Sequence, residues 1–96
     1  MIHSFSDRGT ADLFNGISSR HARAIPNQVK QIALMKLDII NAAQILDDLR
    51  SPPGNRLEAL RGDLSGYHSI RINQQWRIVF RWAGNGAYDV KIADYH

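Results

Sequence analysis

The sequence has no cysteine, only three prolines in 96 residues, and no long apolar run. Without cysteine there can be no disulfide, thiol nucleophile or thiolate metal site, and this composition is typical of a reducing cytoplasm. No apolar stretch reaches the length of about eighteen residues that a membrane-spanning helix needs. The first residues, MIHSFSDRGT, also lack the pattern of a signal peptide. We therefore expect one cytoplasmic domain over residues 1–96, with no membrane contact.

The sequence also lacks the common signatures of metal and nucleotide-cofactor sites. Its four histidines, His3, His21, His68 and His96, are far apart, and none has ligand spacing with a carboxylate. There is no serine nucleophile elbow, no P-loop and no glycine-rich dinucleotide fingerprint. We therefore expect neither a metal nor another cofactor.

Positive charge is concentrated in the second half of the chain. Twelve Lys and Arg against nine Asp and Glu give a net charge of +3 and a pI near 9.7. Between residues 67 and 93 there is one anion, Asp89, and four cations: Arg71, Arg77, Arg81 and Lys91. A net charge this small points only weakly to nucleic acid, so the location of the cations matters more.

The first half of the chain has the periodicity of helices. IHSF is expected to form a short strand, and DRGTADLFNGI a helix with Leu13, Phe14 and Ile17 on one face. SSRHARA is interpreted as a basic connection, and Pro26 suits the first turn of a second helix. The apolar stripe of that helix is predicted to be Ile32, Met35, Ile39, Ala42, Leu46 and Leu49. SPPG is expected to end it.

Three apolar residues of this segment, Leu34, Leu37 and Ile45, fall outside the predicted stripe. They could rest on the first helix. They could instead form a docking surface for a partner protein, together with the basic connection Arg20–Arg23.

After residue 54 the hydrophobic period changes from 3.6 to 2. Apolar residues alternate with polar ones in three segments: Ile70 and Ile72; Trp76, Ile78, Phe80 and Trp82; Tyr88, Val90 and Ile92. RLEALRG is expected to begin the same sheet. The sequence therefore predicts an α+β domain, in which an N-terminal strand and two helices pack on one face of a twisted, mostly antiparallel sheet.

The same alternation places Ser69, Arg71, Arg77, Arg81 and Lys91 together on the other face of the sheet. An uncovered, arginine-rich sheet face could bind the phosphates of RNA. It could equally be the ordinary solvated face of a sheet.

The sequence ends with a carboxylate, a phenol and an imidazole: Asp94, Tyr95 and His96. Beside the arginines, such groups could move protons to and from a ribose hydroxyl and a leaving oxygen without a metal. Three such residues could also be an accident of a terminal segment.

Several segments together resemble the HigB-type toxins of bacterial type II toxin–antitoxin modules, in the RelE/ParE superfamily. The resemblance rests on MIHSF with the following LF helix, on LRGDLSGYHSIRINQQWRIVF, and on the terminal DYH. It implies a RelE-like fold and a ribosome-dependent, metal-independent endoribonuclease that cuts mRNA in the decoding site. It also implies 2′-hydroxyl attack, which gives a 2′,3′-cyclic phosphate and a 5′-hydroxyl, inhibition of translation and growth, and neutralisation by a HigA-type helix-turn-helix antitoxin.

By the same resemblance, five residues match the family's catalytic positions: Arg61, Arg77, Asp94, Tyr95 and His96. Arg71, Arg81 and Lys91 are then expected to bind RNA. One position departs from the pattern, because Glu58 occurs where a toxin of this family carries histidine. Glutamate can act as a general base but cannot be a cation near phosphate. His68 could compensate, although the alternation directs it towards the helices.

Two competing functions remain. ParE-type members of the superfamily poison DNA gyrase and cut no RNA, and a basic sheet could also serve a non-enzymatic RNA-binding module. The terminal DYH and Arg77 favour a nuclease, because simple binding needs no imidazole.

Overall fold

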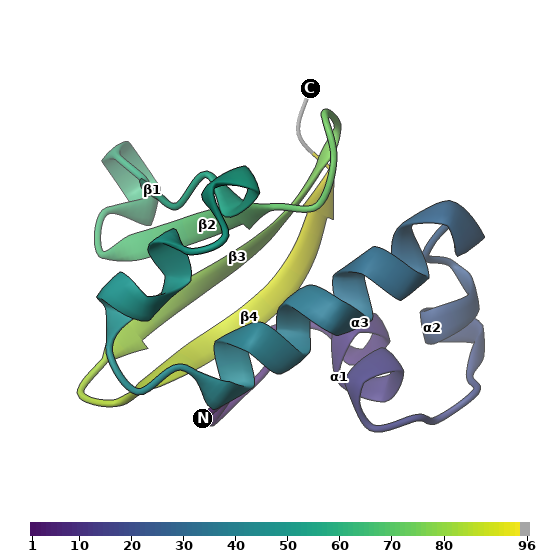
Figure 1. Ribbon diagram of the computed structural model, residues 1–96. Helices are drawn as coiled ribbons and strands as arrows, with labels where there is room; N and C mark the ends of the chain where they lie inside the picture. The colour runs from purple at the N-terminus through teal and green to yellow at the C-terminus, as the bar shows by residue number, and fades with distance from the viewer. Residues whose placement is uncertain (95–96) are drawn as a thin grey trace.

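The computed structural model describes residues 1–94, which form an α+β domain, as predicted (Figure 1). The helices are α1 (Arg8–Phe14), α2 (Arg20–Arg23) and α3 (Asn27–Ala42), and the strands are β1 (Glu58–Ala59), β2 (Tyr67–Arg71), β3 (Trp76–Ala83) and β4 (Gly86–Asp94). Three short 3-10 turns join them: η1 (Leu46–Arg50), η2 (Pro53–Asn55) and η3 (Gly62–Leu64). Over residues 1–94, no helix has the length and apolarity to cross a membrane.

The N-terminal segment, which the sequence predicted to be a short strand, lies beside the last strand, β4. Bridges from Ile2 to Ala87 and from Phe5 to Val90 run parallel to β4. The amide of residue 3 donates to the Ala87 carbonyl at 2.8 Å. Gly86 lets this segment cross closely, because a Cβ there would lie 2.6 Å from the Met1 carbonyl oxygen and against the His3 ring. The first residues thus cover the outer edge of β4.

The predicted basic connection contains a short helix, α2, which makes three helices rather than two. Ser19 caps it by accepting from the Ala22 amide at 3.1 Å, and its hydroxyl donates to Asp12 at 2.7 Å. Helix α1 ends at Phe14, so Ile17 lies beyond the helix and is exposed, contrary to the prediction. Gly9 lets α1 and α2 pack closely, because a Cβ there would lie 2.8 Å from the His21 carbonyl oxygen.

Helix α3 is rotated relative to the prediction. Its buried face carries Val29, Ala33, Leu37 and Ile40, whereas Ile32 and Met35 are 38% and 53% exposed. Stripes that start one residue apart both satisfy the helical spacing, so periodicity alone cannot choose between them. Because Leu37 is fully buried, it belongs to the core and cannot serve as a docking residue.

Helix α3 also ends earlier than SPPG, at Ala42. Ala43 is extended, and the Asp48 carboxylate accepts from the amides of Gln44 and Ile45 at 3.0 and 3.2 Å. Such local side-chain bonds compete with helical ones. Leu49 therefore reaches the core from η1 rather than from the helix.

The four strands form one antiparallel sheet in the order β1-β2-β3-β4, with helix α3 across one face (Figure 1). On that face, as predicted, Ile70, Ile78, Phe80 and Val90 are fully buried. They form one hydrophobic cluster with α3. The opposite face of the sheet therefore carries the alternate residues.

A β-bulge interrupts the alternation on β4. The register between β3 and β4 shifts between Val79 and Arg81, and Asp89 has a left-handed φ of +53°. Asp tolerates this conformation better than most residues. As a result Tyr88 pairs with Arg81 and leaves the apolar face, contrary to the prediction that it shares a face with Val90.

Candidate active site on the open face of the sheet

The open face holds the five residues that the alternation predicted. Cross-strand partners share a face, and the observed pairs are Arg71 with Arg77, Ser69 with Val79, Val79 with Lys91, and Tyr67 with Arg81. Ser69 and Val79 are nevertheless buried, at 0% and 2% exposure. The middle of this face is therefore closed to solvent.

Arg77 is the central cation of the open face. Its side chain is 14% exposed, its Nε donates to the Ser69 hydroxyl at 2.8 Å, and its Nη2 donates to the Arg56 carbonyl at 2.8 Å. A carboxylate oxygen of Glu58 lies 3.6 Å from the same nitrogen. These contacts come from β2 and from residues 56–58, so the guanidinium is held in one orientation.

A buried hydrogen-bond network fixes the segment that supplies the Arg56 carbonyl. Lys36 of α3 donates to the Asn55 side-chain oxygen, and the Asn55 amide donates to the carbonyls of Leu49 and Ser51, each at 3.2 Å. Burial lowers the pKa of Lys36. Arg56 itself has a left-handed φ of +47°. The carbonyl that orients Arg77 is thus anchored from helix α3.

The register sets Arg71 of β2 directly opposite Arg77 of β3, and both are half-buried. Like charges directly opposite one another in a sheet destabilise it. A bound anion would relieve this repulsion, which makes the pair a candidate site for a phosphate-sized anion.

Two further predicted residues come from the edge of the sheet. Glu58 on β1 pairs with Ser69, so it lies on the open face beside Arg77, and its side chain is 60% exposed. Arg61 follows β1, begins the turn η3 and is also exposed. The structure thus brings Glu58, but not Arg61, to a measured contact with Arg77.

The tail is only partly described. Asp94 pairs with Trp76, while Ala93 is the residue opposite Arg77. The Asp94 carboxylate accepts from the Gln75 side-chain amide at 3.2 Å. The predicted roles of Tyr95 and His96 fall on residues outside the described range. Asp94 therefore lies at the same end of the sheet as Arg77, one residue away in the register.

A second cluster, which sequence reasoning missed, occupies the other end of the open face. The Asp89 carboxylate accepts from the Tyr67 hydroxyl at 3.2 Å and lies 3.5 Å from Arg81. The Arg81 guanidinium lies 4.7 Å from the centre of the Tyr88 ring, on which His3 stacks. No sequence signal marks the bulge that creates this cluster. Arg81 is thus already engaged, whereas Lys91 is exposed.

His68 faces the helices, as predicted. It pairs with Phe80 and stacks on that ring at 6.2 Å. Its Nδ1 is buried and has no hydrogen-bond partner among residues 1–94, and burial lowers the pKa of the imidazole. His68 therefore lies on the opposite face of the sheet from Glu58 and Arg77.

Within residues 1–94, no three His, Asp or Glu side chains gather in a way that could hold a metal ion. The described groups can bind an anion through arginines and accept a proton through Glu58.

Comparisons with known proteins identify the family that the chain resembles. A family model described as a RelE-like toxin of the type II toxin–antitoxin system HigB matches residues 3–96. Toxin HigB-1 of Vibrio cholerae is 43% identical over 82 residues, which cover 85% of this chain and 84% of that protein. Endoribonuclease HigB of Proteus vulgaris is 33% identical over 97 residues and the full length of both. In fold, the chain is similar to a YoeB–YefM complex from Staphylococcus aureus, with TM-score 0.62 and 17% identity over 100% of this chain and 98% of that one.

Proposed function

The chain belongs to the family of RelE-like HigB toxins of type II toxin–antitoxin systems, and we propose that it is an endoribonuclease that cuts mRNA on the ribosome. Inhibition of translation and growth follows from such cleavage. The proposed site of action is the cytoplasm, where ribosomes are found.

One observation carries the proposal, namely the opposed pair Arg71 and Arg77 on the open face. Arg77 is held by Ser69 and the Arg56 carbonyl, so it is oriented before substrate arrives. Preorganised donors aimed at a developing negative charge are usually the largest single source of rate enhancement. A scissile phosphate between these two arginines would receive that stabilisation as it becomes pentacoordinate.

The proposed reaction needs one proton acceptor and one proton donor. Glu58 accepts the proton of the ribose 2′-hydroxyl, whose oxygen forms a bond to the adjacent phosphorus. The bond from phosphorus to the 5′-oxygen breaks, and His96 protonates that oxygen, assisted by Asp94 and Tyr95. The products are a 2′,3′-cyclic phosphate and a 5′-hydroxyl. Arg61 is assigned to the same catalytic set, as a further cation near the phosphate.

Ribosome dependence follows from the small size of the site. A domain with a net charge of +3 makes few phosphate contacts, so its own affinity for RNA should be modest and salt-sensitive. The ribosome would supply substrate orientation, which can account for much of a rate enhancement.

The proposed protein partner is a HigA-type antitoxin. The family model describes a toxin–antitoxin system, and the similar Staphylococcus fold is that of a toxin in complex with YefM. Helix α3 offers exposed apolar side chains at Ile32, Leu34 and Met35, and η1 is preceded by exposed Ile45. Exposed apolar groups of this kind are the anchors that protein interfaces use.

The proposal is tested by primer extension on mRNA with and without 70S ribosomes. Wild-type protein should cut only with ribosomes, and Arg77→Ala should cut at least about 100-fold more slowly, as expected for loss of a key donor. Arg77→Lys should recover little of the cleavage rate, because the ammonium group of lysine cannot reproduce the planar, directed N–H donors of the guanidinium. Arg81→Ala is the comparison variant on the same face of β3, because Arg81 is expected to bind RNA: its loss should weaken binding more than it slows cleavage.

Thermal midpoints of all variants would separate chemistry from folding. Normal cleavage by Arg77→Ala would show that the open face is an ordinary solvated surface and not an active site. Accumulation of trapped gyrase–DNA complexes without cut mRNA would instead support the ParE-like function.

A further inference from the structure

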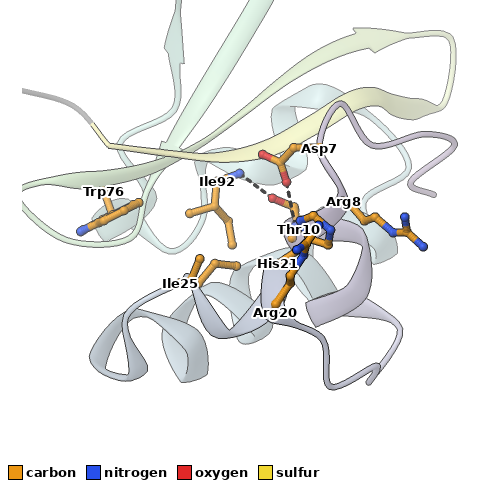
Figure 2. A pocket seen from close by; sticks show the side chains of 10 residues that line it. Asp7, Arg8, Thr10, Arg20, His21, Ile25, Trp76 and Ile92 are labelled. Atoms are coloured by element: carbon orange, nitrogen blue, oxygen red, sulfur yellow. Dashed lines mark hydrogen bonds between the residues drawn. The ribbon is translucent and has the colours of Figure 1, made fainter.

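A cavity of about 490 Å³ lies on the helix side of the sheet, between α1, α2 and the end of strands β3 and β4. Figure 2 shows Ile25 and Ile92 facing each other in its middle, with Trp76 on one side and Asp7, Thr10 and His21 on the other. Ile25 and Ile92 are buried, whereas Arg20 and His21 are exposed. The hollow therefore has an apolar floor and a charged rim. Its volume is in the range of small-ligand sites.

The walls of the cavity are fixed in place. The Thr10 hydroxyl accepts from the Ile92 amide at 2.9 Å, and the Asp7 carboxylate accepts from the Thr10 amide at 2.8 Å (Figure 2). The first bond ties α1 to β4. Gly9 brings α1 against the His21 carbonyl, which ties α1 to α2. A ligand would thus enter a preformed hollow and not have to create one.

Trp76 joins the cavity to the candidate active site. It immediately precedes Arg77 on β3, and successive residues of a strand point to opposite faces. Trp76 also pairs with Asp94, the described end of the tail. The cavity and the arginine pair therefore lie on opposite faces of the same end of the sheet.

The lining has the chemistry of a nucleotide site. Trp76 is half-buried and offers a ring for stacking, and the two isoleucines provide an apolar wall. The rim carries Arg20 and His21 against a single carboxylate, Asp7, which already caps α1. Stacking on an aromatic ring combined with a cation on the backbone is how proteins hold single-stranded nucleic acid.

We propose that this cavity binds one nucleotide of the RNA next to the cleaved phosphate. Its base packs between Trp76 and the wall formed by Ile25 and Ile92, and its phosphate binds Arg20. This inference rests on the proposed function, because it takes RNA as the substrate of the same protein.

Binding can be measured without cleavage. In a Trp82→Phe protein, Trp76 is the only remaining tryptophan and reports directly on the cavity. Titration with a short single-stranded RNA should quench its fluorescence. Arg20→Ala should weaken binding about tenfold and reduce the slope of log affinity against log salt by about 0.7, the value for one phosphate contact. Arg23→Ala is the matched control, because Arg23 lies on the same helix but lines a different hollow with Lys30.

A second variant fills the cavity without removing any of these groups. Ala24 lines the hollow, is exposed and has ordinary helical backbone angles, so Ala24→Phe should fold normally and block the base. We expect it to weaken RNA binding about tenfold, which is within the range for loss of one stacked base. It should also change the base preference beside the cut on ribosomes.

The outcomes separate this inference from the proposed function. If RNA quenches Trp76 fluorescence but the protein never cuts mRNA, the proposed nuclease activity is refuted and the cavity remains an RNA-binding site. Normal cleavage and normal RNA binding by Arg20→Ala and Ala24→Phe would refute the nucleotide site in the cavity but leave the proposed nuclease activity standing. If these variants lose affinity for the antitoxin alone, the hollow belongs to a protein interface and the inference is wrong.

Discussion

Glu58 shows most clearly how one residue can have two opposing effects on this site. Its carboxylate lies 3.6 Å from Arg77, where it occupies part of the space that a phosphate would use. In the proposed reaction the same carboxylate takes the proton of the ribose 2′-hydroxyl. Because the side chain is largely exposed, the ion pair should contribute little to stability. Its effects should therefore appear in binding and in rate, with opposite signs.

We accordingly predict that Glu58→Gln binds RNA more tightly but cleaves it about 100-fold more slowly, as expected for loss of a general base. The amide keeps the size of the side chain and removes its charge. Gel-shift titrations and single-turnover cleavage on ribosomes measure the two effects separately. An unchanged rate would show that another group takes the proton.

His68 gives a prediction about stability against pH. Burial lowers its pKa below the ordinary value of 6.5, so between the folded and unfolded pKa values the unfolded chain binds more protons. The free energy of unfolding must then rise with pH through that window and fall on acidification below pH 6.5. Urea titrations at several pH values should show this dependence reduced in His68→Gln. An identical pH dependence in the two proteins would exclude His68 as its source.

At the scale of elements, the rotation of α3 decides which apolar residues hold the domain together. Leu37 is fully buried and Leu34 is 36% exposed, although they are three residues apart on one helix. Leu37→Ala should destabilise the protein by about 2–5 kcal/mol, the usual cost of a large-to-small core substitution. Leu34→Ala should cost well under half of that. Chemical denaturation of both variants measures the difference, and equal losses would contradict the observed orientation.

The same helix shows how far sequence reasoning extends. The change of period from 3.6 to 2 identified helices before strands, and the alternation from Ser69 to Arg81 placed the arginines on one face. Periodicity could not fix the rotation of α3, because an apolar residue such as Ile32 fits the pattern without being buried. Tertiary packing made that choice.

The sequence likewise predicted some features of the candidate site and missed others. Arg77 could be identified from its motif and its place in the alternation, whereas its orientation by the Arg56 carbonyl depends on a left-handed residue in an irregular segment. The bulge at Asp89, which moves Tyr88 to the open face, also has no periodic signature. The cavity between α1 and α2 needs segments that are distant in sequence, so no local pattern predicts it.

At the scale of the whole molecule, the first residues complete the sheet beside its last strand. Gly86→Ala tests this arrangement, because the new methyl group would meet the Met1 carbonyl and the His3 ring. Such overpacking should cost about 1–3 kcal/mol. Hydrogen exchange should become faster at the amides of residue 3 and Val90, which bond across this edge. Gly54→Ala, where a Cβ meets no atom within 4 Å, is the control and should leave both measurements unchanged.

The pairing of residues 2–5 with β4 also sets an order of events during synthesis. The residues that bond across this edge are separated by more than eighty positions, as in the bond from the Asp89 amide to Ser4. Contacts between residues so distant in sequence form late, because the loop between them must close first. During synthesis, residues 2–5 emerge long before β4, the strand with which they pair, has been made. The edge formed by residues 2–5 and β4 can therefore be completed only after residues 87–90 have been synthesised and have left the ribosome.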